Sequence, residues 1–560
     1  MRSHFYLLLV GLISLGSFAQ VAQFQDNQYE FIDGKWHLIS PEDGTRFQIV
    51  DNTLTVKFDS AASVTQIREF ETQNNLTFLR KALTGWHDYE VAAGVDIFAL
   101  ANNVGETSLV SNVEIPTMGF YTLVPDDSLY NNLWHLNQGN DIDISAEEAW
   151  DITTGDPSVI VSVLDSGVDW IHPDLGLGAD SYENIYLNPG EDAWTDPNDP
   201  STGNGIDDDG NGLIDDWKGW NFGNNWNDAR QDQGGNQFFH GSHVSGIVAA
   251  KTNNGLGVAG VAGGWNNEGA KILACAVGIT GPNGSVLDDA ILYAAEIGSR
   301  QVQLSLTVGP SSAINDAVDM AYDNYGVIIV NASGNGSSSG GAGYPGSLDK
   351  VWAVGATTSG DVRASFSNWG TNLFIAAPGV GIWSTGLTSQ SPYGSSSGTS
   401  FASPIVSGVI ALMLSLDPNF TQAEIQQILI DTADKVGGYD YNWNPADPGH
   451  SRELGYGRIN AQAAVEAAQI LSVSDRSTPG LAALYPNPTN DIIYARLQNM
   501  DTADLEVSVV GINGQEVMRM TPTAIGSDRF SLNVENLASG LYILRVSNQS
   551  NTINAKFIKR

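Results

Sequence analysis

Alternating and helical patterns of apolar residues mark the first quarter of the chain. Residues 54–58 alternate between apolar and polar side chains, which predicts a strand with one buried face. Residues 62–75 and 95–103 carry apolar side chains at helical spacing and predict two short helices. We therefore expect a small α+β domain over residues 20–125.

Longer apolar runs separated by helical stretches occupy the middle of the chain. The runs that read as fully buried strands are Val159–Leu164, Ile272–Val277, Val302–Leu306 and Val327–Val330. Strands that alternate with helices form a mainly parallel sheet with helices on both faces. The pattern therefore predicts a three-layer α/β domain over residues 126–468.

The last part of the chain returns to short alternating strands. Residues 469–483 are rich in Ser, Thr, Asp, Pro and Gly, and we expect them to form a linker. Asn513–Gly514 lies between apolar segments, which predicts a hairpin turn. Residues 484–560 are therefore expected to form a small domain of short strands.

The N-terminal segment has the pattern of a secretory signal peptide over residues 1–19. Arg2 provides a basic start, residues 5–15 an apolar core, and Ser17–Ala19 a cleavage site of small residues. A membrane anchor is the alternative, but the apolar stretch is short for spanning a bilayer.

Composition narrows the possible functions. The chain has 25 Lys and Arg residues against 63 Asp and Glu residues, a formal net charge of −38. Such a charge repels nucleic acid and anionic lipid, so neither is expected as a partner. The 61 glycines argue against long coiled coils, and the apolar content of 42% is enough for packed cores. The single cysteine, Cys275, lies in a predicted buried strand and is expected to pack as a small apolar residue.

Four polar residues stand where predicted strands end or helices begin. Asp165 follows the run 159–164 directly, and Asn335 follows the run 327–330 by a few residues. His240 and Ser400 stand where helices are expected to start, with Pro404 in the first turn of the second helix. In open α/β sheets reactive groups gather at the carboxyl ends of strands, so these residues are expected to meet.

These residue types suit nucleophilic catalysis. A serine hydroxyl needs a base to remove its proton, and histidine titrates near neutral pH. An aspartate behind the imidazole fixes its tautomer, and an asparagine amide can stabilise a developing oxyanion.

The segments around Asp165, His240 and Ser400, in this order, resemble the motifs of subtilisin-like serine proteases. The resemblance covers about residues 128–468, including Gly455–Asn460 near its end. It implies that Ser400 is the nucleophile, His240 the base, Asp165 the residue that orients the base, and Asn335 the oxyanion donor.

Other interpretations of these motifs remain open from the sequence. His240 and His243 could bind zinc, but they lack the i,i+4 spacing and the glutamate of an HExxH site. Ser400 could serve only as a helix cap. The whole chain could be a surface adhesion or binding protein that uses a protease fold as its scaffold.

The resemblance also assigns substrate-binding residues, namely Ser305, Leu306, Thr307, Ser333, Gly334 and Gly343. Thr307 stands where the family usually has a glycine, which would narrow the pocket for the residue before the scissile bond. Gly343 indicates a deep pocket instead. Between these conflicting signals, we expect a medium-to-large apolar residue to be preferred. Phe239 and Ser242 also depart from the small glycine and the threonine that are common in the family.

An acid-rich segment over residues 188–232 contains a calcium-loop pattern. Its predicted ligands are Asp207, Asp209, Asn211, Leu213 (through its backbone carbonyl), Asp215 and Asp216. The final glutamate of a complete EF-hand is absent, since Lys218 stands at position 12, and we expect Asp216 or a distant residue to supply the last ligand. We expect structural Ca²⁺ here; the alternative is a solvated acidic loop.

The flanking units imply an export and maturation pathway. By resemblance, residues 20–125 are a propeptide that blocks the active site, with a maturation cut between about 113 and 128; a stable N-terminal binding domain is the alternative. Tyr485–Thr489 and Gly540–Val546 are similar to the sorting domain of the type IX secretion system of Gram-negative bacteria, and this resemblance implies that residues 484–560 form a small β-sandwich. A carbohydrate- or protein-binding β module is the competing interpretation of residues 484–560.

The expected protein is thus a secreted, calcium-stabilised serine endopeptidase, made as a zymogen and released or held at the cell surface. Its expected partners are polypeptide substrates, its own propeptide and the type IX secretion machinery. We expect a monomer.

Overall fold

The structure is a computed structural model of the 560-residue chain. It describes residues 21–559 apart from 26, 33–34, 41–45, 51, 83, 93, 119–123, 141, 179, 231–238, 279–280, 476–480, 486–488, 498–504, 512–514, 521–522, 527–528 and 548–551. The predicted signal peptide lies outside the described residues. Part of the segment expected to hold the maturation cut, residues 119–123, also lies outside them.

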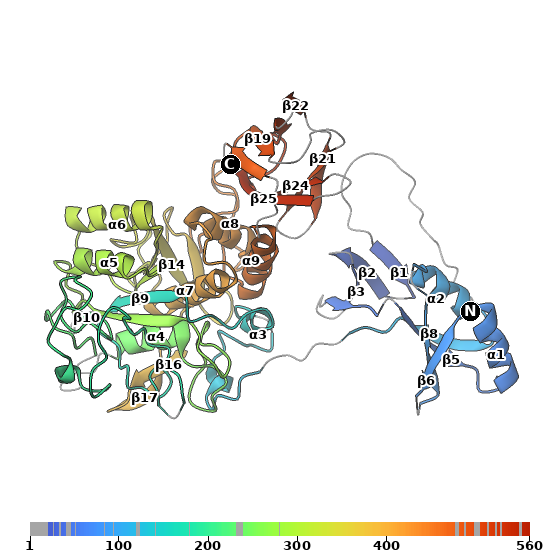
Figure 1. The fold of residues 1–560 in the computed structure, drawn as a ribbon, viewed down its shortest axis with the longest axis horizontal. Coiled ribbons are helices and arrows are strands. Elements are labelled where there is room, and N and C mark those ends of the chain that lie inside the picture. The colour runs from blue at the N-terminus through green and yellow to red at the C-terminus, as the bar shows by residue number, and fades with distance from the viewer. Residues whose placement is uncertain are drawn as a thin grey trace. The chain divides into compact units, whose positions relative to one another are not determined.

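The N-terminal part contains two antiparallel four-stranded sheets (Figure 1). The first has the order β1-β2-β3-β4, with bounds Val21–Phe24, Asn27–Ile32, Lys35–Ile39 and Arg46–Gln48. The second has the order β6-β7-β5-β8, with bounds Thr77–Lys81, Trp86–Glu90, Thr53–Phe58 and Val110–Glu114. Only the strand at 53–58 was expected from the alternation pattern.

Two helices accompany the second sheet, α1 (Val64–Gln73) and α2 (Ile97–Gly105). Ser63 and Gln66 form a capping box that satisfies backbone N–H groups at the start of α1. The apolar sides of both helices share one core with the strands, including Phe70, Val104 and Leu54. The expected α+β pattern is therefore present, and its helices begin two residues later than the sequence indicates.

A seven-stranded parallel sheet forms the centre of the middle part of the chain. Its order is β10 (Trp220–Asn221), β11 (Lys271–Ala276), β9 (Ile160–Asp165), β12 (Gln301–Leu304), β13 (Ile328–Ala332), β14 (Val351–Thr357) and β15 (Ile375–Pro378). An antiparallel pair, β16 (Ile382–Leu387) and β17 (Ser391–Ser396), follows. The buried runs of the sequence correspond to β9, β11, β12 and β13.

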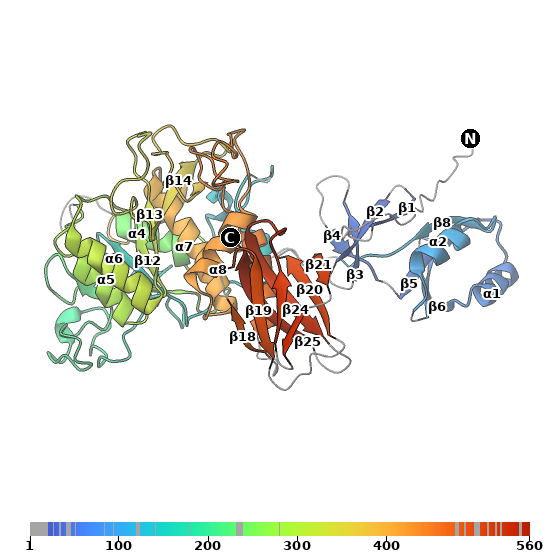
Figure 2. The ribbon, with the colours of Figure 1, turned by 90° about the horizontal axis from the view of Figure 1, so that it is seen from above.

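Helices cover both faces of this sheet (Figures 1 and 2). They are α3 (Ala146–Trp150), α4 (His240–Ala249), α5 (Leu287–Glu296), α6 (Ser312–Tyr325), α7 (Thr399–Leu416), α8 (Gln422–Thr432) and α9 (Ala461–Asp475). On one side α5 and α6 pack against each other, and on the other α7 contacts β12, β13, β14 and β15 and packs against α4. The structure confirms the three-layer α/β fold class.

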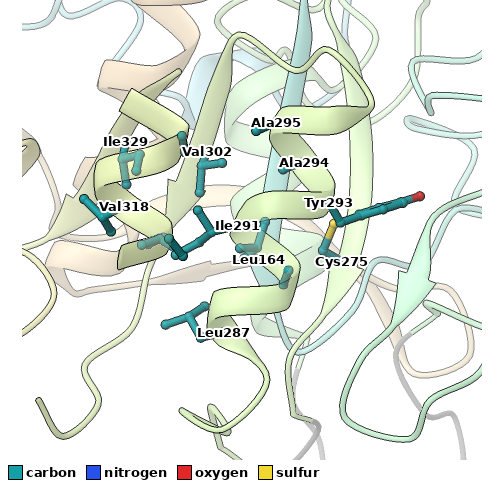
Figure 3. Close-up of a cluster of buried hydrophobic side chains, with 14 of the residues drawn as sticks. Leu164, Cys275, Leu287, Ile291, Tyr293, Ala294, Ala295, Val302, Val318 and Ile329 are labelled. Carbon is teal, nitrogen blue, oxygen red and sulfur yellow. The ribbon is translucent and has the colours of Figure 1, made fainter. Parts of the chain in front are cut away.

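The layer between the sheet and α5 and α6 is a continuous apolar core. Figure 3 shows Leu287 and Ile291 of α5 gathered beside Leu164 and Val302 of the sheet. Leu287, Ile291 and Ala294 recur at i, i+4 and i+7, so one face of the helix is buried. Burying a side chain such as Ile291 contributes about 1.5–3 kcal/mol. Cys275 is a free, buried member of this core, as expected.

The second layer is dominated by α7, an apolar helix of 18 residues. By length and composition α7 could cross a membrane, but 83% of it is buried within the protein, as in the core helices of soluble domains. The helix begins at Thr399, so Pro404 is its sixth residue and lies beyond the first turn. The expected position of Pro404 was therefore wrong, because the helix starts earlier than its apolar stretch.

The C-terminal strands form two four-stranded sheets. One has the order β18 (Leu481–Tyr485), β19 (Ile492–Leu497), β23 (Arg529–Asn533) and β22 (Thr523–Gly526). The other has the order β21 (Glu516–Met520), β20 (Glu506–Gly511), β24 (Gly540–Ser547) and β25 (Thr552–Lys559). β20 and β21 pair antiparallel around the expected hairpin, whose turn at Asn513–Gly514 lies outside the described residues. The linker was expected to begin at residue 469, but residues up to Asp475 belong to α9, so the linker begins later than expected.

Candidate active site

The four candidate catalytic residues lie at ends of elements around the parallel sheet. Asp165 is the last residue of β9, and His240 is the first residue of α4. Ser400 is the second residue of α7, and Asn335 follows β13 by three residues. Each therefore lies at a strand end or a helix start, as the sequence pattern predicts.

Asp165 and His240 form a hydrogen-bonded pair in the site. The Nδ1 atom of His240 lies 2.8 Å and 2.9 Å from the two carboxylate oxygens of Asp165. Gly241 allows this approach, because a side chain there would collide with the carbonyl oxygen of Gly167. The N–H of Gly241 also donates a hydrogen bond to Ser166 Oγ at 3.0 Å, which fixes the start of α4 beside the end of β9.

Two opposing effects set the pKa of His240. Burial lowers the pKa of the imidazole, but the nearby charge of Asp165 and its hydrogen bond outweigh burial and raise the pKa above the usual value. Since Nδ1 faces Asp165, the other ring nitrogen, Nε2, is left to exchange a proton with a substrate or a nucleophile.

The Ser400 hydroxyl donates a hydrogen bond to the backbone oxygen of Ser305 at 3.3 Å. The phenyl ring of the next residue, Phe401, contacts the His240 ring at a centroid distance of 5.4 Å. The same phenyl ring contacts His243 at 4.8 Å. Phe401 lies at the start of α7 and packs against both histidines. This packing brings His240 close to Ser400, the residue before Phe401.

Asn335 is anchored by its side-chain oxygen. Its Oδ1 accepts hydrogen bonds from Thr399 N at 2.9 Å and from Thr399 Oγ1 at 3.0 Å. These bonds leave the Nδ2 amide group as the donor of the side chain, beside Gly398. An amide N–H held beside Gly398, two residues before Ser400, has the chemistry of an oxyanion donor.

His243 is held away from any shared metal position with His240. Its Nε2 lies 3.0 Å from the carbonyl oxygen of Ile382, and the side chain is fully buried. Burial lowers the pKa of His243 to about 4, so it stays neutral. Because Nδ1 of His240 faces Asp165, the two histidines direct their ring nitrogens to different partners, and this geometry disfavours the zinc interpretation.

Three of the expected substrate-binding residues line a pocket of about 240 Å³ that Asp165 and His240 also line. Its lining is Asp165, Ser166, His240, Gly278, Gly281, Pro282, Ser305, Leu306 and Thr307. Ser333, Gly334 and Gly343 do not line this pocket. Gly343 N donates to Ser333 O at 3.0 Å, and a side chain at Gly343 would meet Thr307 Cγ2 at 3.0 Å.

The structure divides the predicted calcium ligands into two groups. Asp209 and Asp216 lie together, and the Asn211 amide donates to both at 3.1 Å. Asp207 instead accepts hydrogen bonds from the backbone N–H groups of Gly210 and Gly212, and Asp215 accepts one from the N–H of Gly205. In the structure Asp207 and Asp215 therefore hold turns of the loop, and the N–H of Leu213 donates to the Asn211 side chain.

Glu191, which the loop pattern did not include, completes the acidic cluster. Glu191, Asp209 and Asp216 each place a carboxylate oxygen within 4.8 Å of the others. Among the residues that the structure describes, Glu191 Oε2 is buried without a hydrogen-bond partner, and burial raises the pKa of Glu191 to about 7. Three carboxylates at this spacing repel one another unless a cation or protons neutralise them, so the donor set fits a hard divalent ion such as Ca²⁺.

Comparison with known families identifies two regions of the chain. Residues 156–457 match the subtilase family, and residues 483–560 match the secretion system C-terminal sorting domain. Both regions fall within the domain boundaries expected from the sequence, apart from residue 483. The exact boundaries, the propeptide and the signal peptide remain predictions.

Several curated proteases are similar to this chain. It is 31% identical over 452 residues to an extracellular basic protease of Dichelobacter nodosus, covering 76% of this chain and 68% of that protein. It is 34% identical to a thermophilic serine proteinase of Bacillus sp. strain AK1, covering 61% of this chain and 69% of that protein. It is 33% identical to thermitase of Thermoactinomyces vulgaris, covering 58% of this chain and 94% of that protein. The chain therefore belongs to the subtilase family and is a secreted subtilisin-like serine protease that carries a type IX secretion sorting domain.

Proposed function

We propose that this protease cleaves peptide bonds of proteins with a triad of Ser400, His240 and Asp165. The observation that carries the proposal is the contact of His240 Nδ1 with both carboxylate oxygens of Asp165 at 2.8 Å and 2.9 Å. This contact holds a proton on Nδ1 and leaves Nε2 to act as the base. In the catalytic step the Ser400 hydroxyl exchanges its hydrogen bond with Ser305 O for one with His240.

Each triad residue then has a defined task. His240 accepts the Ser400 proton as Oγ attacks the scissile carbonyl carbon, and Asp165 stabilises the imidazolium that results. The amide N–H of Asn335 and the backbone N–H of Ser400 receive the charge that develops on the carbonyl oxygen. His240 then protonates the leaving amine, and water hydrolyses the acyl group on Ser400 by the reverse proton path.

The substrate backbone binds as an added strand along Ser305–Thr307, next to the end of β12. Such pairing places the scissile carbonyl between Ser400 and Asn335. The pocket of about 240 Å³ beside His240 receives a substrate side chain on the same edge.

Casein hydrolysis by the purified mature protein tests this proposal. Ser400→Ala removes the nucleophile, and we expect it to abolish activity while leaving the fold intact. Ser415→Ala is a matched control, because Ser415 lies on the same helix and its hydroxyl bonds to Leu412 O near the far end. Equal activity of Ser400→Ala and the wild type would overturn the triad.

We also infer that the enzyme is made as a zymogen, with residues 20–125 as the inhibitory propeptide. The N-terminal part has its own apolar core and an α+β pattern with α1 and α2, which supports an independently folded unit. The intact mass of the secreted active enzyme tests the inference. A mature N-terminus between residues 113 and 128 is expected, whereas active enzyme that begins at Gln20 or Val21 would refute it.

Calcium is proposed as a structural ion in the acidic loop. Glu191, Asp209 and Asp216 would hold it, since their carboxylates converge and Glu191 Oε2 has no hydrogen-bond partner in the described part of the chain. When bound, the ion would neutralise the clustered negative charge and stiffen the segment before α4. It would have no part in the chemistry at Ser400.

A further inference from the structure

The carbonyl group of Ser400 lacks the hydrogen bond that a regular helix would give it. In α7 the usual donor to this carbonyl is the N–H four residues later, at position 404. That residue is Pro404, which has no N–H, and its ring crowds the carbonyl of residue i−4. The backbone of the proposed nucleophile therefore depends on a donor from outside the helix.

Ser305 supplies this donor from the end of the neighbouring strand. Its Oγ donates a hydrogen bond to Ser400 O at 2.7 Å, and its backbone oxygen accepts the Ser400 hydroxyl at 3.3 Å. Ser305 thus contacts Ser400 on both the backbone and the side chain. The hydroxyl of Ser305 can serve Ser400 O only while its single proton points toward it.

Gln303 fixes that direction. On β12, two residues before Ser305, its Nε2 donates to Ser305 Oγ at 3.0 Å, so Ser305 Oγ accepts this bond and its own proton is left for Ser400 O. Nε2 also lies 3.0 Å from Ser403 Oγ. The Oε1 atom of Gln303 accepts from Ser407 Oγ at 2.6 Å and from Ser403 Oγ at 3.1 Å. Ser403 and Ser407 are one helical turn apart on α7, so they face Gln303 together.

We propose that Gln303 is a positioning residue for Ser400, acting through Ser305. It orients the hydroxyl that replaces the helical hydrogen bond missing at Pro404, and it fixes the separation between β12 and the start of α7. Gln303 is fully buried, and its amide is well satisfied, so the network is rigid rather than solvated. The inference rests on the proposed role of Ser400 as nucleophile.

The same strand offers a matched control at Gln301. It is also fully buried and points to the same face of β12, since residues two apart on a strand share a face. Within the described part of the chain, neither Nε2 nor Oε1 of Gln301 has a hydrogen-bond partner. Gln301→Leu and Gln303→Leu therefore make the same chemical change in the same layer, but only the second breaks bonds that lead to Ser400.

The test compares kcat, KM and the rate of Ser400 labelling by a fluorophosphonate for both variants and the wild type. A misplacement of about 1 Å at the nucleophile can cost about 100-fold. For Gln303→Leu we expect kcat and the labelling rate to fall by about 10- to 100-fold, with KM within about threefold of wild type. Gln301→Leu should change neither rate by more than about twofold.

Ser407→Ala keeps the test decisive if Gln303→Leu fails to fold. It removes the 2.6 Å donor that holds Oε1 of Gln303, and we expect a smaller fall in kcat, of about three- to tenfold, with KM retained. A kcat within twofold of wild type in Gln303→Leu, or in Ser407→Ala where Gln303→Leu does not fold, would overturn the inference. So would an equal loss in Gln301→Leu. Ser400→Ala distinguishes the two proposals. Full activity in that variant would refute the triad and the positioning role together, whereas loss of activity in Ser400→Ala with an unchanged kcat in Gln303→Leu would refute the positioning role alone.

Discussion

The side chain of Thr307 lies against Gly343, so that a methyl group added to Gly343 would meet Thr307 Cγ2 at 3.0 Å and Oγ1 at 3.1 Å. The sequence offers two conflicting signals at this place, a narrowing threonine and a glycine that indicates depth. The contact shows that the threonine occupies the space that the glycine leaves open. From this contact we predict a preference for a smaller side chain before the scissile bond, whereas the sequence predicts a medium-to-large apolar residue.

Replacing Thr307 by glycine should let the enzyme accept larger side chains in the residue before the scissile bond. We expect Thr307→Gly to raise kcat/KM at least about tenfold for peptides with an aromatic residue before the scissile bond, because a pocket that differs by a methyl or methylene group discriminates by at least that factor. Peptides with alanine at the same position serve as the internal control and should change little. An unchanged ratio of kcat/KM between the two peptides would show that Thr307 does not limit the pocket.

The central sheet and the positions of the proposed triad residues in it could be predicted from the sequence, because both depend on local patterns. Buried parallel strands are continuous apolar runs, and Asp165, His240 and Ser400 stand at the ends of such runs or at helix starts. Helix and strand bounds shift by one or two residues, since caps and fraying decide them. The sheet of β1–β4 was not expected, because its short strands do not show clean alternation.

Features that depend on distant partners could not be predicted in this way. Glu191 joins Asp209 and Asp216 from well outside the loop pattern, and only the folded chain brings the three together. Gln303 reads as an interruption of an apolar run, and its partners Ser403 and Ser407 come from a helix about 100 residues later. A sequence pattern with a fixed spacing cannot detect the acidic cluster or the hydrogen-bond network of Gln303.

The pH dependence of the enzyme should reflect the balance at His240. Burial lowers the pKa of His240, but the charge of Asp165 and its hydrogen bond together outweigh burial and raise it, so the protonated, inactive imidazolium persists to higher pH. We expect kcat/KM to rise with pH along a limb whose midpoint lies above the ordinary histidine value of about 6.5. A midpoint at or below 6.5, measured on a neutral peptide substrate, would contradict this balance.

Asp165→Asn keeps the size of the side chain beside His240 and removes its negative charge, so it tests the effect of that charge alone. We expect kcat to fall about 10⁴-fold, because an amide no longer selects the tautomer with a proton on Nδ1. The remaining burial should also move the pH midpoint of the residual activity below that of the wild type, since the attractive charge is gone. Residual activity with an unshifted midpoint would show that Asp165 does not control the pKa of His240.

Asn335 should contribute to the rate and little to substrate binding. The hydrogen bonds from Thr399 hold its Oδ1, so its amide group is preorganised before the oxyanion forms. Asn335→Leu is therefore expected to lower kcat by about 10²–10³ with KM nearly unchanged, as for other oxyanion donors. A variant that mainly raises KM would instead assign Asn335 to ground-state binding.

The acidic loop gives a prediction that separates ion ligands from turn residues. At a free calcium concentration of 100 Kd the bound ion adds about 2.7 kcal/mol of stability, so chelation with EGTA should lower the Tm by roughly 5 °C. Asp216→Asn should abolish this difference in Tm between calcium and EGTA, because Asp216 lies in the cluster with Glu191 and Asp209. Asp207→Asn is the matched control and should keep the difference, because Asp207 holds the backbone N–H groups of Gly210 and Gly212. If Asp207→Asn loses the calcium response and Asp216→Asn retains it, the loop binds its ion through the turn residues and the converging cluster is only a solvated group of acids.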